Sequence, residues 1–354
     1  MNNEILCNRT KYFDYLRLFA TFAVIVLHTS ASNLYEINVN TFSWHVFNFF
    51  DSITRWCVPI FVMISGALFL SKDISIKKLY SKYIARLLIA FLLWSAIYYF
   101  AINSWHTITV EHAIIRIIAG HYHMWFILMI IGLYMCVPFI KSFITNTNYT
   151  KYYLLLSICF TSLIPTIILL FNDFFEATVT NITSVITETI DSSDLNTMFR
   201  YSIYFVLGYY LSKTQITPRH RKFIYILGLI GFISTIVLST HCSSISQYAC
   251  SKYYQYLRFN VLLESISVFT WFKHRKHTST KYYPLISRLS KYSFGAYMVH
   301  VLVLEQFIYQ TLHINTLSFN PILSIVSISI TASIISFVIS GIMHQIPIVR
   351  KYMV

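Results

Sequence analysis

An acid, an arginine and a histidine interrupt the first apolar stretch of the chain at a spacing that suits chemistry. This stretch, residues 12–31, is about one bilayer thickness of helix and holds Asp14, Arg17 and His28. The eleven positions from Arg17 to His28 bring the two residues to within about 20° of one helix face and about 16 Å apart along the axis. Asp14 lies on nearly the same face. Because charges inside a spanning helix are costly, this face is expected to border a protein interior or a water-filled cavity.

The residue types at the two ends of this face favour different chemistry. The guanidinium of Arg17 suits fork-like binding of phosphate, and the imidazole of His28 suits proton transfer near neutral pH. Two structural explanations stand beside these functions. Asp14 and Arg17 could form an i,i+3 ion pair at the membrane interface, and His28 could hydrogen-bond to a neighbouring helix. The joint spacing, rather than either residue alone, favours the functional interpretation.

The composition is that of a polytopic membrane protein. The 354 residues are 56% hydrophobic and 11% charged, whereas soluble proteins carry about 25% charged residues. The formal net charge is +14, which in a soluble protein would suggest nucleic acid. Here the basic residues lie mostly in short loops between apolar segments, as the positive-inside rule predicts. This distribution excludes nucleic acid as a partner and leaves membrane lipid as the surrounding medium.

The predicted fold is all-α, with about ten transmembrane helices in a single domain, residues 1–354, and no separate soluble domain. Each predicted helix is an apolar segment of roughly the length that a bilayer requires. The segments are 12–31, 44–70, 81–103, 122–145, 152–171, 198–213, 221–240, 254–272, 290–312 and 320–346.

The charges in the loops predict the orientation of these helices. If ten helices alternate, 21 of the 27 Lys and Arg residues fall on one side, and most acidic loop residues fall on the other. Both termini are therefore predicted to be cytoplasmic. The first segment resembles a signal peptide, but its length and the presence of Asp14 and Arg17 predict a retained signal anchor.

The six cysteines suggest no metal site, because no CxxC or mixed His/Cys spacing occurs. Cys242 and Cys250 share a predicted external loop. A disulfide between them and two free thiols are both open at this stage.

The predicted orientation places a cluster of polar residues in the outer half of the membrane. It consists of His28, Asp51, Arg55, His123 and Glu305. Each has a structural alternative as well. The Asp51–Arg55 spacing suits a mutually neutralising i,i+4 pair, His123 could lie in the headgroup zone, and Glu305 could make helix-packing hydrogen bonds.

Three more polar residues can be placed by their expected depth in the membrane. His300 is expected near mid-membrane, again with a helix-packing hydrogen bond as the structural alternative. Arg86 and Asp14 join Arg17 at the inner end, beside a dense basic loop.

Four short motifs in this order resemble the acyltransferase-3 family of ten-helix membrane acyltransferases. The first is the arginine, ten intervening residues and histidine of Arg17 to His28. The second ends in Phe61-Val-Met-Ile-Ser-Gly66, the third is His123-Met-Trp-Phe126, and the fourth is Ser293-Phe-Gly-Ala-Tyr-Met-Val-His300. The resemblance spans nearly the whole chain and is closest to enterobacterial enzymes that O-acetylate surface polysaccharides, such as O-antigen or common antigen.

The resemblance implies a donor and an acceptor. The donor would be acetyl-CoA or another acyl-CoA, used as a co-substrate rather than held permanently, with its phosphates near Arg17, Asp14 and Arg86. The acceptor would be a sugar hydroxyl of a glycan, free or lipid-linked, outside the bacterial inner membrane. Many members carry R-x-x-R in their third helix, whereas this chain reads Tyr83-Ile-Ala-Arg86; Lys82 is a candidate substitute for the missing arginine.

The same resemblance implies roles for the catalytic residues. His28 would act as general base on the hydroxyl or would carry the acyl group transiently, and the sequence leaves both open. Asp51 or Glu305 is expected to orient its imidazole. Arg55, His123, Trp125 and His300 are expected to contact the substrates. The extra hydrolase-like domain of larger members is absent after the last predicted helix, which suggests a stand-alone transferase.

Two other classes of protein compete with this interpretation. A transporter or flippase for a glycan or its lipid-linked precursor would also carry intramembrane charges, although no half-to-half repeat is evident. A membrane sensor or assembly partner would explain neither the Arg17–His28 alignment nor the basic inner end. The acceptor sugar, the acyl group and the oligomeric state are not encoded in any recognisable pattern.

Overall fold

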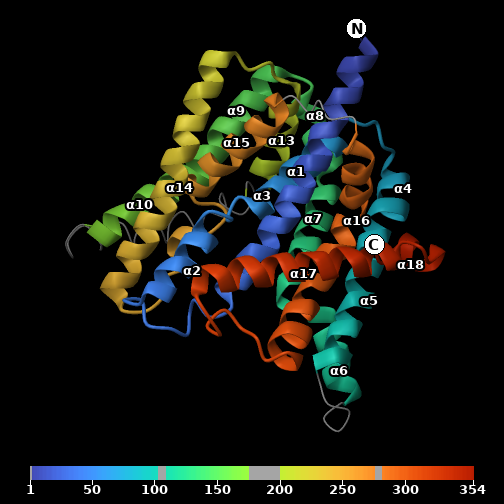
Figure 1. Ribbon diagram of the computed structural model, residues 1–354. Coiled ribbons are helices and arrows are strands. Elements are labelled where there is room, and N and C mark those ends of the chain that lie inside the picture. The colour runs from blue at the N-terminus through green and yellow to red at the C-terminus, as the bar shows by residue number, and fades with distance from the viewer. Residues whose placement is uncertain (1, 103–108, 175–199, 276–280) are drawn as a thin grey trace. The chain divides into compact units, whose positions relative to one another are not determined.

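The computed structural model describes residues 2–102, 109–174, 200–275 and 281–354, and the regular structure in these ranges is helical (Figure 1). Within these ranges, seven helical segments are long and apolar enough to cross a membrane, which confirms a polytopic all-α membrane protein. They are Lys11–Ala31, Phe42–Phe69, Ile76–Ile102, Val110–Met135, Thr147–Phe174, Pro218–Ser246 and Pro321–Met343.

Each of the three other predicted spans also contains a helix. They correspond to α13 (Ser202–Lys213), α15 (Phe259–His274), and α16 (Tyr283–Leu302) with its π-helical continuation η6 (Val303–Thr311). The first two are shorter than a typical span, and the third carries more polar residues. The predicted start of the span at 198–213 lies outside the described residues.

The chain divides into two compact units, which are described separately here. The first unit comprises Met1–Asn33, Asp73–Cys136 and Lys276–Val354, and the second comprises Leu34–Lys72 and Val137–Arg275.

The first unit is organised around α1 (Asn2–Ala31), which packs against α16 and α17 (Pro321–Met343). Several serines of α17 are buried and let α16 approach closely. At this contact Ser340 Oγ donates to the carbonyl of Tyr292, and a Cβ at Gly295 would lie 2.4 Å from Ser340 Oγ. This close packing fixes the register of α16, which carries much of the candidate site.

Shorter helices complete the first unit. They are α4 (Ile76–Lys78), η1 (Leu79–Ile84), α5 (Ala85–Ile102), α6 (Val110–Ala119), η3 (Tyr122–Met124), α7 (Trp125–Met135) and α18 (Pro347–Tyr352). Neither α6 nor α18 was predicted from the sequence. The segment after α18 is anchored, because Arg86 Nη2 and Trp94 Nε1 donate to the carbonyls of Val354 and Met353.

The second unit is built on two helix pairs. In one, α14 (Pro218–Ser246) packs on α15, and in the other α3 (Cys57–Phe69) packs on α13. The remaining elements are α2 (Phe42–Ser52), α8 (Val137–Ile144), α9 (Thr147–Ser157), η4 (Ile158–Leu163), α10 (Ile164–Phe174) and η5 (Lys252–Tyr254).

The predicted continuous helix 44–70 is interrupted between α2 and α3. Residues 53–56 form turns, and Trp56 Nε1 donates to the carbonyl of Ile53 at 2.6 Å. Pro59 explains why a new helix begins nearby, because it has no N–H for the carbonyl of residue 55. Proline is tolerated in the first turn of a helix.

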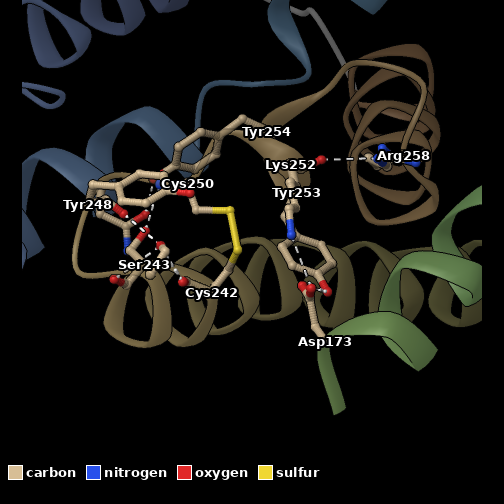
Figure 2. The surroundings of a disulfide bond; sticks show 11 residues. Asp173, Cys242, Ser243, Tyr248, Cys250, Lys252, Tyr253, Tyr254 and Arg258 are labelled. Carbon is tan, nitrogen blue, oxygen red and sulfur yellow. Dashed lines mark hydrogen bonds and ion pairs between the residues drawn. A yellow bond between two sulfur atoms is a disulfide. The ribbon is translucent and has the colours of Figure 1, made fainter. Parts of the chain in front are cut away.

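A disulfide joins Cys242, near the end of α14, to Cys250 (Figure 2). The residues that follow Cys250 tie neighbouring elements together. Tyr253 Oη and Lys252 Nζ bind the carboxylate of Asp173, at 2.8 and 3.2 Å. The structure thus resolves the alternatives for these two cysteines in favour of a bond that closes the loop between α14 and η5.

Candidate functional site

His28 lies in the wall of a cavity of about 380 Å³ within the first unit. The end of α1 contributes His28 and the adjacent Ser32, η3 contributes Tyr122, and the α16–η6 segment contributes Glu305 and Tyr309. Ala31, Val301 and Leu304 complete the lining. The cavity therefore combines an imidazole, a carboxylate and hydroxyl groups with apolar walls, as is typical of sites for small polar ligands.

Three imidazoles gather behind this wall. The ring of His28 lies 5.1 Å from that of His300 and 6.4 Å from that of His123, measured between centroids. His123 and His300 are buried. His121 extends the cluster, because its Nδ1 lies 2.9 Å from Nδ1 of His123 and its ring stacks on Tyr98 at 4.3 Å. The prediction that His28 and His123 lie close together is confirmed, and His300 joins them.

Glu305 is held by residues of the segment that precedes α7. Tyr122 Oη donates to its Oε1 at 2.9 Å, and His121 Nε2 lies 3.8 Å from its Oε2. Both Glu305 and His28 line the cavity. The carboxylate is thus fixed at the site by a tyrosine hydroxyl. That Glu305 orients the imidazole of His28 stays a prediction.

The local backbone explains why these residues meet. The α-helix α16 changes to the π-helix η6 after Leu302, between His300 and Glu305. Tyr98 Oη supports the change by donating to the carbonyl of Met298 at 2.8 Å and by accepting from the N–H of Leu302 at 3.3 Å. Segments of π-helix recur at functional sites because they redirect side chains.

At the other end of the aligned face of α1, Asp14 and Arg17 are joined to α16. Ser290 Oγ donates to Asp14 at 2.8 Å and accepts from Arg17 Nη1 at 2.9 Å. Tyr283 Oη also donates to Asp14, at 2.9 Å, and the Asp14–Arg17 ion pair has a length of 3.7 Å. The ion pair, which the sequence left open as a structural alternative, is present, and it belongs to a network that fixes the guanidinium.

A second cavity of the first unit is strongly basic. It has a volume of about 610 Å³ and is lined by Arg86, Arg288, Lys291, Tyr292, His344, Gln345 and Arg350. Burial, together with the positive charges of Arg86, Arg350 and Lys291, lowers the pKa of His344. This lining has four permanent cations and no carboxylate, so it suits a polyanion.

The remaining predicted residues are distributed over both units. Asp51 and Arg55 lie in the second unit, where Arg55 Nε donates to the fully buried Asp51 at 2.7 Å and the guanidinium lies 4.4 Å from the ring centroid of Tyr254. The predicted Asp51–Arg55 pair is confirmed. Lys82 is exposed on η1, with Nζ 6.0 Å from the ring centroid of Tyr83, and Trp125 is exposed at the start of α7.

Several residues of the site carry no signal in the sequence. Ser32, Tyr98, Tyr309, Tyr283 and Ser290 are ordinary members of apolar or loop segments, in a chain with 27 tyrosines. Their roles arise from contacts between α1, α5 and α16, which no spacing along one helix encodes. Tyr122 could have been singled out, because it lies between His121 and His123.

The comparison with known families decides the class of protein. A family described as "Acyltransferase domain" matches residues 10–341, nearly the whole chain. The chain belongs to the acyltransferase-3 family. It is therefore a membrane-bound acyltransferase that transfers acyl groups other than aminoacyl groups. No match was found among curated proteins or among solved structures.

Proposed function

We propose that this acyltransferase is an O-acetyltransferase of a bacterial inner membrane, with both termini in the cytoplasm. It would move an acetyl group from cytoplasmic acetyl-CoA to a sugar hydroxyl of a surface polysaccharide or its lipid-linked precursor. The observation that carries the proposal is the placement of His28 in a cavity at one end of α1, while Arg17 is fixed at the other end.

The basic cavity supports a CoA thioester as the donor. CoA carries several phosphate charges, and Arg86, Arg288, Lys291 and Arg350 offer them four cations. Lys291 and Arg288 flank Ser290, the residue that binds Arg17. This proximity along α16 supports a phosphate site at the same end of α1 as Arg17. The pantetheine arm would then extend toward His28, about 16 Å away along the axis.

The cavity at His28 supports a sugar as the acceptor. Sugars present several hydroxyl groups and apolar C–H faces, and the lining supplies partners for both. Glu305 and Ser32 can hydrogen-bond with hydroxyl groups, and the rings of Tyr122 and Tyr309 can contact C–H faces. Its volume of about 380 Å³ accommodates one or two sugar units of a longer glycan.

In the proposed reaction His28 acts as general base. It removes the proton of the sugar hydroxyl while the oxygen attacks the thioester carbonyl. The C–S bond then breaks, and the proton passes from His28 to the CoA thiolate, so that the products are an acetyl ester and CoA-SH. Glu305 and Tyr122 would hold the acceptor hydroxyl. Asp51, Arg55, Trp125 and Lys82 remain predicted contributors.

Substitution of the two residues on α1 tests this function. We expect His28→Ala to abolish transfer of labelled acetate from acetyl-CoA to the glycan, because the base is lost, while acetyl-CoA still binds. Arg17→Ala should abolish transfer and weaken acetyl-CoA binding. His241→Ala, a histidine of α14 that stacks on Phe174, serves as the matched control. A fully active His28→Ala protein would overturn the proposal.

The interruption of the segment 42–69 favours a second candidate, a glycan transporter or flippase, because broken helices are frequent in transporters. Mass spectrometry of the surface glycan with and without the gene separates the two. A mass increment that disappears with the gene supports transfer of an acyl group. Loss of the surface glycan with no change in its acylation supports transport.

A further inference from the structure

The surroundings of His300 determine which of its two ring nitrogens carries the proton. It is fully buried at the end of α16, and its Nδ1 lies 2.5 Å from the carbonyl oxygen of Tyr297. A carbonyl oxygen can only accept a hydrogen bond, so Nδ1 must carry the proton. In the neutral imidazole Nε2 is then the acceptor. That Nε2 atom is buried and has no hydrogen-bond partner in the structure.

A buried acceptor without a donor is unfavourable, so a donor is expected next to Nε2. The ring of His28 lies 5.1 Å from that of His300, with an angle of 52° between the ring planes. This separation allows an N–H···N hydrogen bond of about 2.9 Å between the facing edges of two imidazoles.

His123 is the other imidazole that lies close to His300, at 5.5 Å between centroids. Its ring is nearly perpendicular to that of His300, at 86°, and its Nε2 is itself buried without a partner. No group of three His, Cys, Asp or Glu side chains among the described residues could hold a metal ion. Of the two neighbouring imidazoles, that of His28 lies nearer to His300 and also lines the cavity, so we take it as the donor to Nε2.

We propose that His300 is the positioning residue of His28: its Nε2 accepts a hydrogen bond from one nitrogen of His28 and thereby directs the other, unprotonated nitrogen into the cavity. The chain of contacts runs from the Tyr297 carbonyl through Nδ1–H and Nε2 of His300 to His28. A backbone carbonyl and the neutral imidazole of His300 would thus orient His28 and fix its tautomer. In a hydrolase triad a carboxylate orients the histidine in the same way. The inference rests on the proposed role of His28 as base.

Two substitutions of His300 separate this role from simple packing. In His300→Asn the amide can replace Nδ1–H but offers nothing at the position of Nε2. In His300→Gln the amide oxygen can reach the position of Nε2. We expect His300→Asn to lower kcat for acetyl transfer by about 30-fold or more, with unchanged acetyl-CoA affinity, and we expect His300→Gln to recover most of that loss.

The assay follows labelled acetate from acetyl-CoA into the glycan fraction of membranes that contain the native acceptor. Thermal unfolding of each purified variant checks that it folds, and His241→Asn is the control substitution. An active His28→Ala protein would refute the proposed function itself. If His28→Ala is inactive, the positioning role fails when His300→Asn keeps near-normal kcat. It fails equally when folded His300→Gln is as impaired as His300→Asn.

Discussion

His344 lies where the end of α17 meets the cations of the basic cavity, and its charge should respond to whatever binds there. Its Nδ1 faces the carbonyl of Ser340 at 3.3 Å. Burial and the neighbouring cations lower its pKa, so it is neutral at pH 7. A bound polyanion would offset those cations, raise the pKa and favour protonation.

The affinity for acetyl-CoA should therefore increase as the pH falls. Because a change of one pKa unit corresponds to about a tenfold change in affinity, we expect Kd to fall by about three- to tenfold between pH 8 and pH 6. Isothermal titration calorimetry in two buffers of different ionisation enthalpy would also detect the uptake of a proton.

The control is His344→Asn, in which the pH dependence due to this residue should vanish. Protonation of the donor's own phosphates affects both proteins equally, so the difference between them isolates His344. Identical pH profiles for the two proteins would contradict a phosphate site beside His344.

At the scale of single residues, the sequence predicted contacts between residues three or four positions apart. The Asp14–Arg17 and Asp51–Arg55 pairs follow from i,i+3 and i,i+4 spacing, and both occur. The attachment of Asp14 to Tyr283 could not be predicted, because it joins residues 269 positions apart.

At the scale of elements, α3 and α13 of the second unit cross at very short range. A Cβ added to Gly66 would lie 1.8 Å from the carbonyl oxygen of Phe205, and one added to Gly208 would lie 2.0 Å from that of Met63. The two backbones therefore touch reciprocally, and only glycine fits at either position.

Alanine at either glycine should separate the two helices. We expect Gly66→Ala and Gly208→Ala each to lower the free energy of unfolding by about 3 kcal/mol or more, because the obstructing atoms belong to the backbone and overpacking commonly costs about 1–3 kcal/mol. The midpoint of thermal unfolding in detergent measures the effect.

Gly132 in α7 provides the matched control, since nothing lies within 4 Å of its added Cβ. Gly132→Ala should be neutral or stabilise the helix by up to about 1 kcal/mol. If all three variants unfold at the same temperature, the α3–α13 contact is looser than the structure indicates.

The elements themselves were predictable to different degrees. Long apolar runs predicted α14 and α17 well, because an uninterrupted run of that length has few alternatives in a membrane. The break between α2 and α3 and the π-helical segments η1, η4 and η6 were missed. Hydropathy does not register such changes of helix type, which depend on side chains that satisfy the displaced backbone groups, as Tyr98 does.

At the scale of the whole molecule, the disulfide Cys242–Cys250 closes a short loop at one end of α14. For a sequence separation of 8, the chain-entropy estimate of its contribution to stability is about 2–3 kcal/mol. We expect Cys242→Ser and Cys250→Ser each to lower the midpoint of thermal unfolding. Wild-type protein treated with a reductant should unfold at the same lowered temperature.

Cys136 is exposed and free among the described cysteines, so Cys136→Ser is the control and should not respond. A wild-type protein whose unfolding is insensitive to reductant, although alkylation shows that its thiols have been freed, would contradict a stabilising role for the bond.

Positive charge at the start of α14, on Arg219, Arg221 and Lys222, predicts that this end faces the cytoplasm. The cysteine end would then lie on the opposite side, in the compartment where disulfides persist in bacteria. Two independent features, loop charge and a cystine, thus support the same orientation.

The formation of this disulfide can therefore also report when the loop is inserted. If the loop lies outside the cytoplasm, as the loop charges predict, its sulfurs can be oxidised only after residues 242–250 have crossed the membrane, because the cytoplasm keeps thiols reduced. In a pulse-labelled chain, the loss of alkylation at these two positions would date the completion of the α14–α15 hairpin relative to synthesis of the C-terminal residues. The time at which this disulfide forms would thus measure the progress of membrane insertion without any added reporter group.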